Sequence, residues 1–375
     1  MEFIDLKAQY KILEKEINTA IQNVLNHGGF IMGKEVAELE EQLKDYVGRK
    51  YCVTCANGTD AMAMVLMAWD IKEDDAVFVP SFTFMSTAEV VSLRGATPVF
   101  VDIDIDTFNI DVNSLEDAIK CVIAEGKLKP KAVIPVDLFG LPADYDKLVP
   151  LAKKYNLLIL EDGAQGFGGT INGKKVCSFG EASTTSFFPA KPLGCYGDGG
   201  AIFTDDEELY SVLTSIRVHG KGEYKYDNVR VGLNSRLDTI QAAILLPKFK
   251  AFKEYELADR QKWGGVYKSL LQNIVKTPTI PKGYTSSFAQ YTIMLANEKQ
   301  RDILQKKLKE NGIPSMVYYP KPLHMQSVYK NLGFEYVCLP QSEMASKCVL
   351  SLPMHPYLDA EAVNNIYNIT RIRYF

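Results

Sequence analysis

The stretch 157–165 reads LLILEDGAQ, four apolar residues followed at once by two carboxylates, a glycine, an alanine and a glutamine. An apolar run without polar alternation is typical of a parallel strand that helices cover on both faces. Comparable β-rich runs precede it at 51–55, 76–79, 97–101 and 131–136. Helical patterns alternate with these runs at 59–69, 84–94, 114–124 and 144–154. This rhythm predicts an α/β fold with a mostly parallel central sheet.

The rest of the chain predicts a second, smaller domain. Two helical stretches, 6–25 and 34–47, come before the sheet, and a long helical pattern at 235–271 follows it. Pro247 lies inside that pattern, where we expect it to kink the helix. A chain of 375 residues exceeds what one core usually holds. We therefore expect a large domain with N-terminal helices over 1–245, then a connecting helix and a small α/β domain over 246–375.

Composition excludes several classes of function. The formal net charge of −4 gives no basic field for nucleic acid. No apolar run reaches the ~20 residues of a membrane span, and the opening MEFIDLKAQY lacks a signal-peptide pattern, so we expect a cytoplasmic protein without membrane insertion. Cys52 and Cys55 form a C-x-x-C pair within an apparent strand, which favours buried thiols over a metal or redox site. We expect no metal.

Lys191 is the most informative single residue, within SFFPAKPLGCYGDGGA at 186–201. An amine held in an apolar, glycine-lined turn has a lowered pKa and can condense with a carbonyl group. Pyridoxal 5′-phosphate is the obvious cofactor with such a carbonyl. The sequence therefore predicts a covalent cofactor site at Lys191.

Ligands of such sheets bind beyond the carboxyl ends of the strands. Asp162 follows a strand there and could keep a pyridine nitrogen protonated, with Gln165 beside the ring hydroxyl. Asp162 could equally cap the next helix. ANGTDA at 56–61 opens a helix after a strand, so Gly58, Thr59 and the hydroxyl of Ser186 could hold a phosphate. The turn has no dinucleotide-binding glycine pattern.

Seven segments in order give the chain a family resemblance. They are ANGTDA, PSFTFMSTAE, VDIDIDTFNID, EDGAQ, TSFFPAKPLGCYGDGGA, RVHG and GLNSRLDTIQAAIL. Together they resemble the DegT/StrS-type nucleotide-sugar aminotransferases, which have the aspartate-aminotransferase-like fold (fold type I). The resemblance implies pyridoxal 5′-phosphate, bound covalently to Lys191, and a homodimer with shared active sites. It also implies that Asp162 binds the ring nitrogen, Gln165 the ring oxygen, and that Phe84 stacks on the ring.

The same resemblance implies that Gly58, Thr59 and Ser186 bind the cofactor phosphate, together with Asn234 of the second subunit. Phe82, two residues before Phe84, is expected to be a core residue. Within the family, FIDLK at 3–7, RVGLNSRLDTIQAAILLPK at 230–248 and LSLPMHPYLD at 350–359 resemble UDP-2-acetamido-2-deoxy-3-oxo-D-glucuronate aminotransferases. Two departures are Phe84, where those enzymes tend to have tyrosine, and Tyr318-Tyr319-Pro320, where they have His-Tyr-Pro.

Residues for the sugar are less well marked. A UDP-sugar acid needs local cations, and six basic residues fall within twenty positions: Arg217, His219, Lys221, Lys225, Arg230 and Arg236. Arg236 is the expected contact to the nucleotide sugar, across the dimer interface, whereas Lys221 and Lys225 are expected to be solvated. Tyr318, Tyr319 and His324 are the other expected substrate contacts. Tyr318 cannot titrate near neutral pH as histidine does.

The implied reaction transfers an amino group from L-glutamate to a UDP-linked keto-sugar, at C3 of the 3-keto-glucuronate, for bacterial lipopolysaccharide and O-antigen precursors. Lys191 would serve as anchor and as acid and base. Other nucleotide keto-sugars stay open, among them dTDP-3- or 4-keto-6-deoxyhexoses and GDP-4-keto-6-deoxymannose, as does a non-transaminating sugar enzyme with the same cofactor. A sugar dehydratase of this fold carries histidine in place of the lysine, which argues against that activity.

Overall fold

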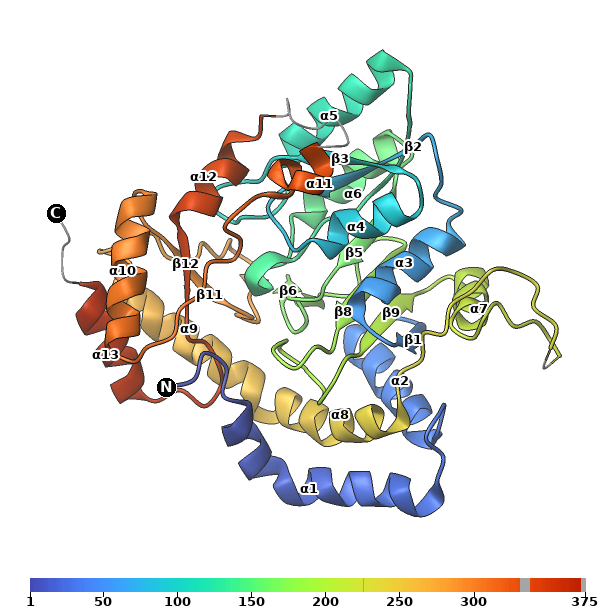
Figure 1. The fold of residues 1–375 in the computed structure, drawn as a ribbon, viewed down its shortest axis with the longest axis horizontal. Coiled ribbons are helices and arrows are strands. Elements are labelled where there is room, and N and C mark those ends of the chain that lie inside the picture. Colours follow the sequence, from blue (N-terminus) through green and yellow to red (C-terminus); the bar gives the residue numbers. More distant parts are fainter. Residues whose placement is uncertain (225, 331–337, 372–375) are drawn as a thin grey trace.

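A seven-stranded sheet forms the centre of the large domain (Figure 1). The computed structural model describes residues 1–224, 226–330 and 338–371. In spatial order the strands are β1 (Tyr51–Cys55), β9 (Gly200–Thr204), β8 (Ala182–Ser186), β5 (Leu158–Asp162), β4 (Lys129–Val133), β2 (Asp75–Pro80) and β3 (Thr97–Val101). Neighbouring strands are parallel except where β9 pairs with β1 and with β8. The predicted mostly parallel α/β sheet is confirmed.

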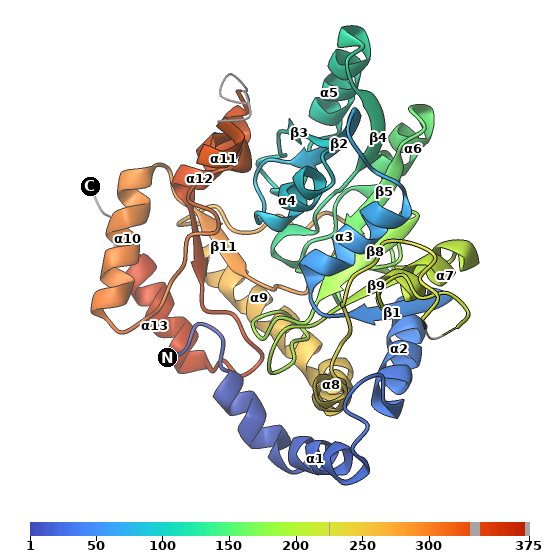
Figure 2. The ribbon, with the colours of Figure 1, turned by 45° about the vertical axis from the view of Figure 1, so that its right-hand side comes forward.

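Helices cover both faces of this sheet (Figures 1 and 2). One face packs against α3 (Gly58–Ala68), α4 (Ser86–Leu93) and α7 (Glu207–Ile216). The other packs against α2 (Lys34–Val47), α5 (Val112–Glu125), α6 (Tyr145–Lys154) and α8 (Thr239–Ala251). Along β2, Val77 and Val79 enter the first core, whereas Ala76 and Phe78 enter the second. A strand buried on both sides has no place for polar alternation, which explains its apolar sequence.

The helix that leaves the large domain is longer and less regular than a single α-helix. It consists of α8, a π-helical segment (Phe252–Glu256) and α9 (Leu257–Leu271). Pro247 does not end α8, and the irregularity lies five residues beyond it. Leu245 and Phe249 of α8 belong to the core of the large domain, whereas Trp263 and Tyr267 of α9 belong to another core. The change of core thus falls near the π-helical segment, slightly beyond residue 245.

The second core belongs to the smaller C-terminal part. Its antiparallel pair of strands, β11 (Tyr291–Met294) and β12 (Val349–Leu352), packs with α9, α10 (Glu298–Glu310) and α13 (Ala360–Thr370). Asp102, just after β3, accepts hydrogen bonds from the amides of Gln341 and Ser342 in the first turn of α12 (Pro340–Cys348), at 2.9 and 2.8 Å. This contact fastens the C-terminal part to the carboxyl edge of the large sheet.

Shorter elements complete the chain. They are β6 (Thr170–Ile171), β7 (Lys174–Lys175), β10 (Tyr284–Thr285), α11 (Ser327–Tyr329) and the 3₁₀ turns Leu138–Gly140 and Leu323–Met325. The first helix, α1 (Leu6–His27), lies along α8 (Figure 1). Cys52 and Cys55 are buried, as expected for core thiols. In the described parts of the chain, no helix combines the length and apolar character needed to cross a membrane.

Candidate active site

The carboxyl edge of the sheet gathers most of the predicted cofactor residues. Asp162 is the last residue of β5, and Ser186 is the last residue of β8. Gly58 opens α3, three residues after β1 ends, and Phe84 follows β2 by four residues. Because β1, β2, β5 and β8 point the same way, their ends bring these residues to one edge.

Lys191 lies in a tight loop between β8 and β9. The loop is closed by hydrogen bonds from Phe187 N to Gly199 O, at 2.7 Å, and from Lys191 N to Phe188 O, at 2.9 Å. A Cβ atom on Gly194 would lie 2.6 Å from the carbonyl oxygens of two neighbouring loop residues, so this fold of the loop requires glycine. Burial lowers the pKa of Lys191, and the carboxylate of Asp162 opposes part of that shift. More of the amine is therefore neutral near pH 7 than in a solvated lysine.

Asp162 is 5% exposed and has two hydrogen-bond donors. Thr87 Oγ1 donates to Oδ2 at 3.2 Å, and the amide of Ala164 donates to Oδ1 at 3.2 Å. Burial raises the pKa of Asp162, while these donors and the Lys191 ammonium lower it. Thr87 was not singled out from the sequence. It lies in the first turns of α4, three residues after Phe84, and that spacing within PSFTFMSTAE was the available signal.

Gln165 and Tyr319 form the next part of the site. Gln165 Nε2 donates to the hydroxyl of Tyr319 at 3.1 Å, and its Oε1 accepts from Phe139 N at 2.8 Å. The ring of Tyr319 lies 6.3 Å from that of Phe84, centroid to centroid. Phe84 is 54% exposed, whereas Phe82 is fully buried against Phe139. An exposed aromatic face beside buried polar groups suits a planar ring ligand.

The turn at Gly58 can hold a phosphate. A Cβ atom on Gly58 would lie 2.8 Å from Cβ of Ser186, so only glycine lets α3 begin this close to the end of β8. Asn57 caps α3 by accepting from Asp60 N at 2.8 Å. The amides of Gly58 and Thr59 precede the first intrahelical bond, from Ala61 N to Asn57 O. These amides and the Ser186 hydroxyl form an anion-binding corner.

The residues present therefore fit pyridoxal 5′-phosphate. An amine of lowered pKa, a buried carboxylate, an exposed aromatic ring and an anion-binding corner occur at one sheet edge. Each matches one part of that cofactor: its carbonyl carbon, its ring nitrogen, its ring face and its phosphate.

The loop at 217–236 divides into structural and exposed residues. Ser235 Oγ accepts from Ala56 N at 3.1 Å, so this chain's own Asn234 and Arg236 lie beside the phosphate turn. Asn234 is exposed and Arg236 partly buried. The position of Lys225 falls outside the described residues. Arg217 does not belong with the candidate substrate cations, because its side chain is only 7% exposed and is ion-paired with Glu40 at 2.6 Å.

His324 is a buried residue. The imidazole is 2% exposed, with Ser81 Oγ 2.6 Å from Nδ1 and Glu343 Oε1 3.5 Å from Nε2. Burial lowers its pKa, so this histidine is a neutral group that joins the C-terminal part to the end of β2. Tyr318 is partly buried, beside the ring of Phe3.

The sequence and the fold of this chain match those of known proteins. The model of the DegT/DnrJ/EryC1/StrS aminotransferase family matches residues 11–371. The UDP-2-acetamido-2-deoxy-3-oxo-D-glucuronate aminotransferase of Pseudomonas aeruginosa is 47% identical over 98% of both chains. A crystal structure of a DegT/DnrJ/EryC1/StrS aminotransferase from Brucella abortus is 50% identical, with a TM-score of 0.95 over 99% of this chain and 98% of the other.

A third similar protein, NtdA from Bacillus subtilis, was solved with the bound cofactor PMP. It is 28% identical, with a TM-score of 0.87 over 98% of this chain and 83% of the other.

Proposed function

This chain belongs to the DegT/DnrJ/EryC1/StrS aminotransferase family, and we propose that it transfers the amino group of L-glutamate to C3 of UDP-2-acetamido-2-deoxy-3-oxo-D-glucuronate. It is a pyridoxal-phosphate-dependent nucleotide-sugar aminotransferase. The observation that carries the substrate proposal is 47% identity, over 98% of both chains, with an enzyme named for that keto-sugar. The product would serve polysaccharide or lipopolysaccharide synthesis.

When bound, pyridoxal 5′-phosphate supplies an electron-accepting ring that stabilises negative charge beside the amine. Lys191 Nζ is the amine that would bond to it and would move a proton during the reaction. Its lowered pKa favours the neutral form, which accepts the proton. Asp162, fixed by Thr87 and Ala164, presents a carboxylate to the ring nitrogen. Gln165, held by Phe139 N and Tyr319, is set to contact the ring oxygen.

The sugar is proposed to contact Arg236, Tyr318 and Tyr319. Arg236 follows Ser235, whose hydroxyl accepts a hydrogen bond from Ala56 N beside the phosphate turn, and is proposed to reach the sugar bound by the second subunit. A guanidinium can bind a diphosphate or carboxylate with two hydrogen bonds. Burial raises the pKa of Tyr318, so the phenol stays protonated and can donate to a carboxylate of the sugar. His324, buried between Ser81 and Glu343, is not included in this proposal.

We also propose that the enzyme is a cytoplasmic homodimer. Asn234 and Arg236 are exposed or partly exposed at the site's edge in the single chain, which suits a role across a subunit interface. All seven cysteines are free, and five of them are buried, as expected in a reducing compartment.

Half-reactions followed by the absorption of the bound cofactor test the proposal. Enzyme given L-glutamate should lose its visible band, and only the UDP-3-keto-glucuronate should restore it fully. UDP-3-keto-N-acetylglucosamine, dTDP-4-keto-6-deoxyglucose and GDP-4-keto-6-deoxymannose are the comparison substrates. Lys191→Ala should not complete either half-reaction. If only a dTDP or GDP sugar restores the visible band, the proposed substrate is wrong. If no amino donor removes the band, the proposed transamination is wrong.

A further inference from the structure

A large cavity lies at the amino-terminal ends of the parallel strands, on the opposite side of the sheet from the active site. Its volume is 1190 Å³. Its walls include Asp75 at the start of β2, Lys129 at the start of β4, Leu158 at the start of β5 and Asp205 just after β9. Because β9 runs antiparallel, its end meets the starts of the other strands. The cofactor residues stand at the far ends of these strands, so the cavity is separate from the active site.

Positive charge dominates this cavity. Its lining contains six cations, Arg49, Lys129, Lys131, Lys153, Lys174 and Lys175, against three carboxylates. In residues 1–224, 226–330 and 338–371, none of the five lysines has a carboxylate within 4.0 Å of its ammonium. Such a concentration of cations is unexpected in a chain whose formal net charge is −4.

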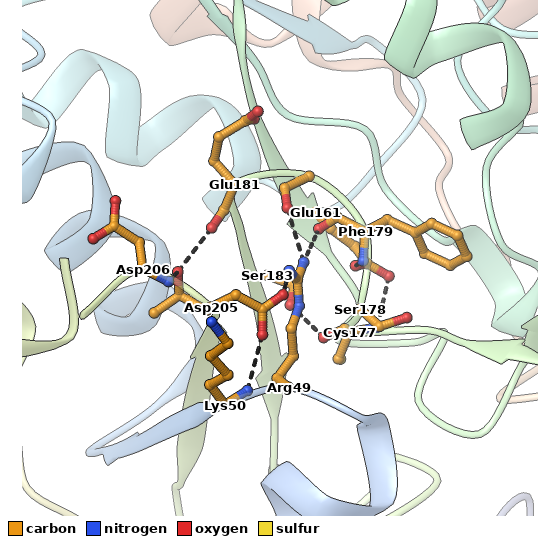
Figure 3. A network of polar contacts seen from close by, with 12 residues as sticks. Arg49, Lys50, Glu161, Cys177, Ser178, Phe179, Glu181, Ser183, Asp205 and Asp206 are labelled. Carbon is orange, nitrogen blue, oxygen red and sulfur yellow. Dashed lines mark hydrogen bonds and ion pairs between the residues drawn. The ribbon is translucent and has the colours of Figure 1, made fainter. Parts of the chain in front are cut away.

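The three carboxylates are already engaged. Asp75 Oδ2 accepts from Lys72 N at 3.0 Å, and Glu181 Oε2 accepts from Ile159 N at 2.7 Å. Asp205 accepts from Arg49 at 2.7 Å and from Lys50 N at 2.9 Å (Figure 3). Backbone amides and Arg49 thus satisfy the hydrogen bonding of the acids, and the six cations and three carboxylates of the lining leave a formal charge of +3.

Hydrogen bonds and aromatic contacts hold part of the cavity wall in place. Arg49 is 7% exposed at its side chain, and besides Asp205 it donates to Phe179 O at 2.7 Å and Gly180 O at 2.8 Å (Figure 3). Lys174 lies 4.6 Å from the ring centroid of Phe179, and Lys175 lies 3.6 Å from that of Tyr46. The two lysines are therefore placed by aromatic faces rather than by acids.

We propose that this cavity is a second ligand site, which binds a small molecule bearing a diphosphate group. The five lysines come from three elements, β4, α6 and β7, and Arg49 comes from the turn between α2 and β1, so the cations approach a ligand from several segments. A compact ligand with several negative charges can engage many of them at once. The volume of 1190 Å³ is above the roughly 300–1000 Å³ of ligand pockets, so a molecule bearing a diphosphate group would fill only part of the cavity. Free pyrophosphate and a nucleoside diphosphate share this chemistry.

The first experiment locates binding by chemical protection. Holoenzyme is labelled with an amine-selective reagent, with and without inorganic pyrophosphate or UDP, and each lysine is quantified by mass spectrometry. Lys129, Lys131 and Lys153 should be protected at least threefold, whereas the exposed Lys15, Lys268 and Lys299 should not. Protection by both probes indicates that the site recognises the diphosphate alone. Protection by UDP but not by pyrophosphate indicates that the site also recognises the nucleoside. Equal labelling with and without both probes refutes the site.

The second experiment separates this site from the active site. Lys129→Gln/Lys131→Gln/Lys153→Gln should bind pyrophosphate at least about tenfold more weakly by calorimetry, with the KM for glutamate unchanged. Lys15→Gln/Lys268→Gln/Lys299→Gln removes the same charge elsewhere and should bind as wild type. Equal weakening in both triple variants refutes a built site. Loss of self-association in the first variant, without small-anion binding by wild type, shows that a second copy occupies the cavity and refutes the proposal.

Discussion

Replacing Arg217 with methionine should destabilise the large domain without weakening substrate binding. Its Nη1 is 2.6 Å from Glu40 Oε1 and 3.1 Å from Thr54 O, and the side chains of the pair are 7% and 16% exposed. Removing one partner of a buried pair costs roughly 3–5 kcal/mol. Glu40 keeps two hydrogen bonds from Thr54, both at 2.8 Å, so we expect the lower end, about 3 kcal/mol.

Urea unfolding of the holoenzyme measures this loss, and steady-state kinetics measures KM for the sugar. Glu40→Gln and the double variant complete a double-mutant cycle, in which the coupling should be about 1–3 kcal/mol. Arg236→Gln is the matched arginine control: it should raise KM for the nucleotide sugar at least about tenfold and leave stability nearly unchanged. If Arg217→Met unfolds like wild type and raises KM instead, the assignment of Arg217 as a structural residue is wrong.

Three further outcomes follow from individual contacts. Gly58→Ala should weaken cofactor binding at least about tenfold in absorbance titrations, because its Cβ would lie 2.8 Å from Ser186, whereas Gly265→Ala, with open space around it, should not. Lys248→Met should stabilise the protein by about 3 kcal/mol at pH 7, because burial lowers the pKa of this lysine to about 8 from 10.5. The folded state then binds fewer protons than the unfolded chain, so wild-type stability should rise from pH 8 to 10.5 and the variant's advantage should shrink; a constant advantage contradicts the titration. His324→Gln should lower the free energy of unfolding by about 1–2 kcal/mol, because it disturbs the Ser81 contact, and should leave KM for the sugar unchanged. A raised KM would show that His324 contacts the substrate.

The sequence predicted the sheet where its strands are buried on both faces. Runs such as LLIL lead into β5 because apolar residues there fill two cores. The polar ASTTS of β8 and the short GAIFT of β9 were not predicted, since neither carries a distinctive pattern. Hydroxyl groups in β8 donate to the backbone of other segments, such as Thr184 Oγ1 to Glu161 O at 3.3 Å. Only tertiary contacts make such a segment a buried strand.

The sequence predicted the site residues whose positions follow from the ends of the strands. It did not predict which other polar residues are buried and therefore structural. Lys191, Asp162 and Gly58 stand at the carboxyl edge, which strand order alone locates. Arg217 and His324 resemble substrate ligands in sequence, and only their burial against Glu40 and Ser81 shows a structural role. Spacing along the chain does not predict whether such a side chain points into the core or into the site.

The adjacent carboxylates Glu161 and Asp162 show this limit most clearly. Side chains of consecutive strand residues point to opposite faces, so only one of the two can enter the cofactor site. Glu161 accepts from Cys177 N at 2.7 Å and Phe179 N at 2.8 Å, and Phe179 O in turn accepts from Arg49 (Figure 3). Burial raises the pKa of Glu161, so it favours the protonated form more than a solvated glutamate does. Glu161 thus supports the wall of the basic cavity, while Asp162, one peptide bond away, meets Thr87 in the active site. A single strand therefore positions Asp162 for the active site and Glu161 for the hydrogen bond to Phe179 in the cavity wall.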